Sequence, residues 1–183
     1  AVGKGSMSAI IDGGSNTAVG LSALSDDTKG SKSTGVGYQA LSSQNFTSAT
    51  DSHNTAVGYN AGSLISTGEK NTIAGSTAGD ALTTGFNNTV MGYDALGSNT
   101  ASGAHVAIGY EALATMNSTT NTSQFNVAVG TQAGKLLTTG TYNTFIGPQS
   151  GFNMTTGGKN TFIGQYDGNN GSLDLRTDSN NIV

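Results

Sequence analysis

The strongest constraint in the sequence is a short motif that occurs ten times, in full or in part, and always ends in glycine. Its form is Asn-Thr-x-Φ-Gly, in which Φ is an aliphatic residue, and residues 54–58, 143–147 and 160–164 are clear copies. From one copy to the next, the glycines are 17, 17, 21, 17, 17, 17, 21, 17 and 17 residues apart. Such a period indicates one structural unit stacked on copies of itself. These anchor glycines are Gly3, Gly20, Gly37, Gly58, Gly75, Gly92, Gly109, Gly130, Gly147 and Gly164.

The remainder of each period repeats as well. Three residues after the anchor glycine comes a small residue in every period except the last, where Asp167 stands instead. The next position holds either glycine or a large apolar residue, as at Gly62 and Leu96. Many periods then have a second apolar residue and a further glycine, as at Ile65 and Gly68. Because glycine favours tight turns, we expect two short extended pieces and two turns in each period.

This period predicts an all-β fold, a parallel β-solenoid or β-roll. A unit of 17 residues is too short for helical-pair repeats, and glycine recurs too often for a stable helix. One unit per coil gives about ten coils of 17 residues, two of them lengthened to 21. Equivalent residues would lie about 4.8 Å apart in neighbouring coils, where a column of asparagines can form a hydrogen-bonded ladder. We expect the solenoid to span residues 1–168, and residues 169–183 to form a closing segment that leads to a further C-terminal region.

The motif strand is apolar on both of its faces, and this bears on assembly. Side chains alternate between the two faces of a strand, so Ile146 and Ile163 point away from their neighbours Phe145 and Phe162. A strand that is apolar on both faces is usually covered on both. One chain can cover only the inner face. The sequence therefore predicts a homo-oligomer, most simply a homotrimeric fibre with apolar columns at its axis.

Composition narrows the classes of function. The 183 residues include 28 glycines, one proline and no cysteine, and only 10% of them are charged. A net charge of −4 with scattered lysines argues against nucleic-acid binding. No apolar run approaches the roughly 20 residues of a membrane-spanning helix, so we expect no membrane insertion. The sequence starts inside a repeat, and we expect it to be part of a longer protein.

Two families resemble the sequence. Tandem Asn-Thr-(Ala/Phe)-(Val/Ile)-Gly units followed by residues 171–183 are similar to phage tail-fibre proteins. This resemblance implies a trimeric, extracellular virion fibre that binds the host cell surface and often precedes a self-cleaving chaperone domain. Residues 105–114 and 126–133 resemble the head repeats of trimeric autotransporter adhesins, which implies a bacterial cell-surface location instead. Both resemblances imply attachment to a host glycan or protein, and the tail fibre is the leading interpretation.

Two kinds of position are candidates for receptor contact. Four tyrosines follow anchor glycines in adjacent pairs, and they either form a stacked ladder that packs the trimer or present their rings to a receptor. The two long coils carry extra residues within residues 42–52 and 114–125, and insertions in solenoids often form the binding face. The alternative is that these coils are bulges on a rod whose receptor site lies elsewhere. The candidate contacts are Tyr38, Tyr59, Tyr93, Tyr110, Phe46, Asp51, Asn117 and Phe125.

We expect no catalytic, cofactor or metal site, and we do not expect an enzyme. His53 and His105 are 52 residues apart, too far along the stack to share one metal ion. The carboxylates of Asp26, Asp27 and Asp51 could hold a surface cation, although solvated turn residues are the simpler interpretation. A more distant hypothesis is an ice-binding solenoid, which would need a regular array of hydroxyl pairs such as residues 83–84.

Overall fold

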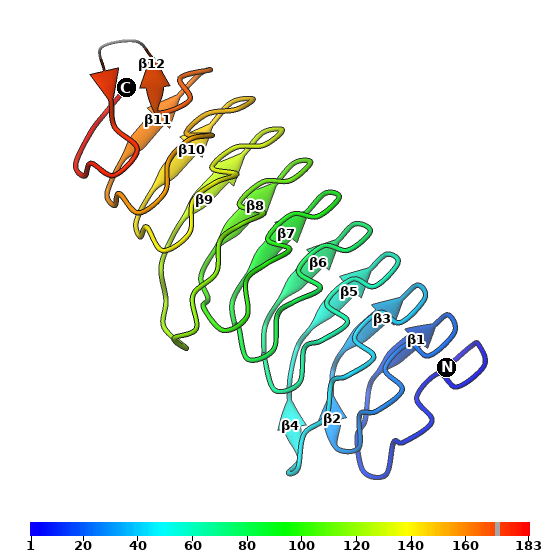
Figure 1. Ribbon diagram of the computed structural model, residues 1–183. Helices are drawn as coiled ribbons and strands as arrows, with labels where there is room; N and C mark the ends of the chain where they lie inside the picture. Colours follow the sequence, from blue (N-terminus) through cyan, green and yellow to red (C-terminus); the bar gives the residue numbers. More distant parts are fainter. Residues whose placement is uncertain (171–172) are drawn as a thin grey trace.

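The computed structural model describes residues 1–170 and 173–183, and Figure 1 shows it as a stack of coils along one axis. Nine strands form one sheet in the order β1-β3-β5-β6-β7-β8-β9-β10-β11. Neighbouring strands are parallel and keep one register, so that Thr55 pairs with Thr72 and Thr72 with Thr89. The predicted all-β parallel solenoid is confirmed, with no helix among the described residues. The nine strands are β1 (Thr17–Val19), β3 (Thr34–Val36), β5 (Thr55–Val57), β6 (Thr72–Ala74), β7 (Thr89–Met91), β8 (Val106–Ile108), β9 (Val127–Val129), β10 (Thr144–Ile146) and β11 (Thr161–Ile163).

The second extended piece forms strands only beside the first long coil. There β2 (Gly30–Ser31) pairs in parallel with β4 (Thr50–Asp51), and beside the second long coil a single bridge joins Gly103 to Ser123. In the other described coils this region consists of turns and bends. Its backbone still forms hydrogen bonds with the next coil, as Ser66 N–H does with the carbonyl of Thr83. The expectation of two extended pieces is therefore wrong for most coils. Their corners turn too tightly for strand geometry.

The anchor glycines allow the coils to approach each other closely. Gly75 has a φ of +143°, a backbone conformation that residues with side chains rarely adopt. A Cβ atom added there would overlap the carbonyl group of Gly92 in the next coil. The same overlap recurs at every anchor glycine from Gly3 to Gly147. The period read from the sequence is thus the period of this close backbone contact.

Two positions fill the core in each coil, namely the fourth residue after the anchor glycine and the central residue of the strand, and the larger side chain lies at one or the other. Four residues after the anchor glycine the backbone is left-handed whichever residue stands there, with φ of +51° at Leu24 and +60° at Gly134. Where that residue is glycine, a larger neighbour uses the room, as the ring of Phe145 does beside Gly134. Where it is leucine, the strand centre is small, as Gly35 is beside Leu24. This exchange keeps the interior closely packed.

Buried asparagines form the predicted ladder. The side-chain oxygen of Asn54 accepts hydrogen bonds from the backbone N–H of Asn71 at 3.0 Å and from its amide at 3.2 Å. The Asn71 amide also donates to the carbonyl of Gly85 at 2.9 Å. Asn88 repeats the first two bonds with Asn71 as its acceptor. Each step therefore pairs a buried backbone donor and a buried amide, and both would be costly to leave unpaired.

The other face of the nine-stranded sheet is apolar and uncovered within this chain. Each strand directs its central residue inward and its first and third residues outward, and we call the outward residues the outer sheet face. The third residues are aliphatic and partly or well exposed, for example 44% at Val57 and 51% at Met91. The inward residues are buried, and Phe145 and Phe162 lie in the chain's own core. The predicted two-faced pattern is confirmed, while the partner chain that would cover the outer sheet face stays a prediction.

Residues 173–183 continue the stack. Asn181 donates to the Asn160 side-chain oxygen from its backbone N–H at 3.0 Å and from its amide at 2.9 Å, which is the ladder geometry over a 21-residue step. Ile182 bridges to Thr161 in parallel. This step is as long as those of the two long coils. Gly171 and Ser172 of the predicted closing segment lie outside the described residues.

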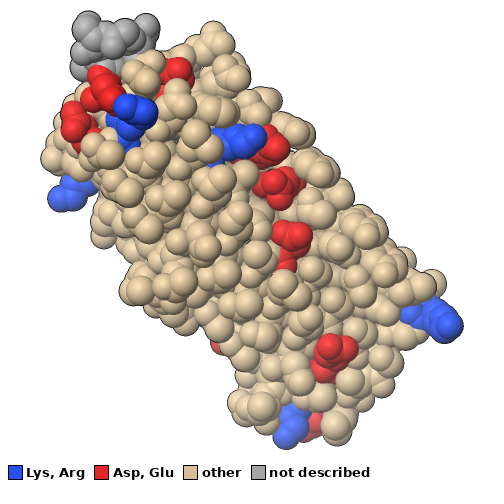
Figure 2. Space-filling view, viewed as in Figure 1, with Lys and Arg blue, Asp and Glu red and all other residues tan. Residues whose placement is uncertain are grey.

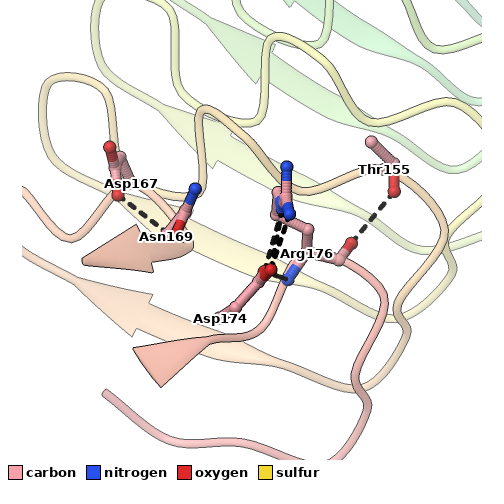
Figure 3. A network of polar contacts seen from close by, with 5 residues as sticks. All are labelled: Thr155, Asp167, Asn169, Asp174 and Arg176. Carbon is pink, nitrogen blue, oxygen red and sulfur yellow. Dashed lines mark hydrogen bonds and ion pairs between the residues drawn. The ribbon is translucent and has the colours of Figure 1, made fainter. Parts of the chain in front are cut away.

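A small antiparallel pair lies within that step. It consists of β12 (Asn169–Asn170) and β13 (Leu173–Asp174). Figure 3 shows the Arg176 guanidinium against the Asp174 carboxylate, with Nη2 2.6 Å from Oδ2. The carbonyl of Arg176 accepts a hydrogen bond from the Thr155 hydroxyl at 3.1 Å. The bond from Thr155 connects the closing segment to the preceding coil, and the Arg176–Asp174 ion pair lies within the segment.

Candidate attachment surface

The four predicted tyrosine contacts form two stacked pairs at the carboxyl ends of β3, β5, β7 and β8. The ring centroids of Tyr38 and Tyr59 are 5.1 Å apart with an interplanar angle of 10°, and those of Tyr93 and Tyr110 are 5.6 Å apart at 12°. All four residues are 41–54% exposed. The predicted stacking is confirmed. One face of each ring is covered by its partner, and a receptor role stays a prediction.

A third aromatic pair lies at the opposite ends of the strands. Phe125, a predicted contact, stacks on Tyr142 with centroids 5.2 Å apart at 24°. Both are about half exposed. Sequence reasoning missed Tyr142. A signal was present, since Phe125 and Tyr142 each directly precede a ladder asparagine and lie in adjacent coils. Aromatic pairs therefore border the outer sheet face on both sides.

The first long coil directs its aromatic side chain into the rod. Phe46 is only 5% exposed, so its prediction as a receptor contact is wrong. The ring turns inward because burial of its apolar surface lowers the free energy. Asp51, another predicted contact, is exposed but forms an ion pair with Lys32 at 2.6 Å. The hydrogen bond from Lys32 also lowers the pKa of the Asp51 carboxyl.

A buried polar cluster holds the same coil from inside. The Gln44 amide donates to Asp27 Oδ2 at 2.6 Å, and Gln44 Oε1 accepts from the Asn54 amide at 2.8 Å. Asp27 Oδ1 also accepts the backbone N–H of Gly30 at 2.9 Å. Asp27 is 1% exposed, so the alternative of a surface cation at Asp26 and Asp27 is wrong for Asp27. Its oxygens are occupied by bonds within the chain.

The second long coil presents its extra residues to solvent. Residues 119–122 are all exposed, as is the predicted contact Asn117. Within the loop, the hydroxyls of Ser118, Thr120 and Thr122 form a row with oxygen distances of 2.9 and 3.1 Å. In Figure 1 the loop between β8 and β9 reaches beyond the neighbouring coils, on the same side of the rod as β2 and β4. Both long coils therefore project in one direction.

Charged side chains are few, and Figure 2 shows a mostly uncharged surface with acidic groups in a row. Burial raises the pKa of Asp80, and the nearby charge of Asp94 adds to the effect. Burial and the charge of Glu111 likewise raise the pKa of Asp94. Hydrogen bonds from Gln132 and Lys135 instead lower the pKa of Glu111. Across residues 1–170 and 173–183, no group of three or more His, Cys, Asp or Glu side chains could hold a metal ion.

His105 interrupts the asparagine ladder. Its backbone N–H donates to Asn88 Oδ1 at 3.0 Å, and the Ser102 hydroxyl lies 3.0 Å from Nε2. Nδ1 is buried and has no hydrogen-bond partner among the described residues. Burial lowers the pKa of His105 from its usual 6.5 to about 4, so the imidazole is neutral at pH 7.

We expect His105 to make the rod sensitive to acid. Between pH 6.5 and 4 the unfolded chain binds a proton at this histidine and the folded chain does not, so stability falls as the pH decreases through this window. The loss amounts to about 3 kcal/mol once the pH is below both values. Urea unfolding midpoints at pH 7 and pH 4.5 measure it. His105→Asn should reduce this pH dependence, whereas the exposed His53→Asn should preserve it. An unchanged pH dependence in His105→Asn would contradict the assignment.

Comparison with protein-family models, with curated proteins and with solved structures found no match to this chain. Among the described residues, no helix is long and apolar enough to cross a membrane. What the rod can do follows from its own geometry, namely a regular axis, an uncovered sheet face and two projecting coils.

Proposed function

We propose that this chain is a segment of an extracellular attachment fibre of the phage tail-fibre kind, in which three copies pack their outer sheet faces around a common axis. The outer sheet face carries the proposal. It presents threonine and aliphatic side chains from nine strands in one register, and none of its residues is charged. The aliphatic third residues form one continuous exposed column along this face, and an exposed apolar surface that is continuous over so many strands marks an interaction site.

The outer sheet face is large enough for a stable assembly. Nine strands spaced about 4.8 Å apart make it roughly 40 Å long, and the six residue steps from one aromatic border to the other make it about 20 Å wide. The resulting area of about 800 Å² matches the contribution of one partner to a standard specific interface. Identical uncharged faces also meet without like-charge repulsion.

The unevenness of the aliphatic column favours a protein partner over ice. Ala74 and Met91 are neighbours in this column, and their side chains differ greatly in length. Such relief suits interdigitation with another chain, whereas a flat crystal surface requires equal heights. The threonine column is also interrupted by Val106 and Val127.

A trimer in which each copy projects its long coils outward would present several identical contact surfaces and so gain from multivalency.

Removing residues 119–122 tests attachment by converting the second long coil into one of 17 residues. These residues are exposed and loop closure depends weakly on length, so the melting temperature should change by less than about 3 °C. Binding of the fluorescently labelled trimer to a panel of bacterial strains should fall about tenfold or more on strains that the unaltered chain binds.

A length-matched control replaces residues 119–122 by Gly-Ser-Gly-Ser, which keeps the length of the loop and removes its threonine and asparagine side chains. Full binding by the shortened chain would indicate that this segment is a spacer and that attachment lies elsewhere. Failure of the unaltered chain to bind any strain would contradict the attachment proposal itself.

A further inference from the structure

A shallow hollow with a volume of about 200 Å³ lies on the side of the second long coil that faces the N-terminal coils. Its walls come from the same corner of two successive short coils and from the tip of the long coil. The volume is below the roughly 300–1,000 Å³ of pockets for drug-sized ligands, so it suits one small ring with the rest of a chain in solvent. The lining residues are Thr67, Glu69, Lys70, Thr84, Phe86, Asn87 and Asn121.

The hollow forms because one intervening coil has a small corner. Residues 101–104 read Ala-Ser-Gly-Ala, and they lie between the coil of Phe86 and the overhanging loop that carries Asn121. A Cβ atom at Gly103 would overlap the Phe86 carbonyl and lie 3.1 Å from its ring. Glycine at this position therefore lets the Phe86 ring lie against the next coil, where it contributes an apolar wall.

The chemistry of the lining is mixed and has no net charge. The Lys70 ammonium lies 3.7 Å from the Glu69 carboxylate, so the two formal charges cancel. Thr67 and Thr84 supply hydroxyls, and Asn87 and Asn121 supply amides, each of which can both donate and accept hydrogen bonds. An anionic ligand would require an excess of positive charge, which this hollow lacks.

We infer that this hollow binds one ring of a neutral saccharide. A pyranose ring has hydroxyls around its edge that match the hydroxyl and amide groups, and an apolar C–H face that can pack against the Phe86 ring. The inference deepens the proposed attachment function and rests on it, because it assigns the ligand class and the place of contact. Asn121 belongs to the exposed loop of the second long coil, so this loop completes the site.

A second hollow occupies the same corner farther along the rod and shows what distinguishes the first. It is lined by residues of two short coils and of the closing segment, including Thr141, Lys159 and Ser179. Its lining residues, all within the described part of the chain, include no aromatic side chain. The Ser179 hydroxyl is also used by the chain itself, since it accepts the N–H of Gly158 at 3.0 Å. We therefore assign the saccharide only to the hollow beside Phe86.

The test measures binding of the assembled protein to an array of immobilised neutral oligosaccharides of hexoses and N-acetylhexosamines, with sialylated and sulfated glycans alongside. Phe86→Leu keeps the apolar packing on Gly103 but removes the aromatic face, and it should weaken binding about tenfold. Asn121→Ala should weaken it several-fold. The control Asn45→Ala, at an exposed position of the first long coil, should stay within about twofold of the unaltered chain.

The result that supports the inference is binding to at least one neutral glycan that both hollow variants weaken and the control does not. Binding to no neutral glycan, binding only to charged glycans, or equal binding by all variants would each overturn it. Cell attachment that persists unchanged in Phe86→Leu would overturn the saccharide site while leaving the attachment function intact. Glycan binding without attachment to any cell would instead contradict the attachment function and leave the site supported.

Discussion

Gly75→Ala is expected to destabilise the rod by about 3 kcal/mol or more and to lower its melting temperature by about 10 °C. The added methyl group imposes a φ that residues with side chains rarely adopt and overlaps the backbone of Gly92. Relief by a shift of the backbone is blocked, because Gly58 on one side and Gly92 on the other make the same close contact with their own neighbours. Denaturant unfolding followed by circular dichroism measures the effect.

Gly14→Ala is the matched control. A Cβ atom at Gly14 would have no atom within 4 Å, and the backbone there is not left-handed. Alanine should leave stability unchanged or raise it slightly, because it restricts the unfolded chain more than glycine does. Equal melting temperatures for Gly75→Ala and Gly14→Ala would show that the close approach of the coils does not determine stability.

The second large effect concerns assembly. The double substitution of Val57→Asp and Met91→Asp is expected to convert the proposed trimer into a folded monomer at micromolar concentration. Both residues are about half exposed in the isolated chain, so a carboxylate there remains hydrated in the monomer. In the trimer, six carboxylates would be buried near the axis without partners, at a cost of several kcal/mol each. Sedimentation equilibrium distinguishes the two states.

Two further substitutions separate assembly from folding. Leu64→Asp changes an equally exposed apolar residue outside the outer sheet face and should leave the trimer intact. Phe162→Asp should instead unfold the local coils, because Phe162 is fully buried within its own chain and packs against Phe145 and Tyr166. A double mutant at Val57 and Met91 that remains trimeric would place the interface on another surface.

The fold was predictable because the residues that define the period are those that the stack constrains most. The anchor glycines from Gly3 to Gly147 cannot be replaced without steric overlap. Asparagines such as Asn71 bond to the coils on both sides, because Asn71 donates to Asn54 and accepts from Asn88. Both constraints recur once per coil, so the sequence shows the number and length of the coils directly. The inward and outward alternation of the strand followed from the geometry of any β-strand.

The surface was less predictable, because the exposure of a side chain depends on contacts between different coils, and the repeat pattern of a single coil does not show these contacts. Phe46 and Phe125 both lie in long coils, yet Phe46 is buried and Phe125 is half exposed. Around Phe46, the Asp27–Gln44 bond and the Lys32–Asp51 ion pair close the loop, and these involve residues 17 and 19 positions apart. The ladder step at Asn181 was missed for a simpler reason, since no motif glycine follows it in this sequence.

Each coil contacts mainly its two neighbours, so the rod can become longer or shorter only by whole coils. Deleting residues 59–75 would join Gly58 to Ser76 with all later glycines and asparagines still in register. The rod would then be shorter by one strand spacing, about 4.8 Å. Deletions that do not match a period would shift every later coil out of the ladder. Genetic duplication or loss of whole periods can therefore change the length of the rod in steps of one coil, while the remaining coils keep their surface unchanged.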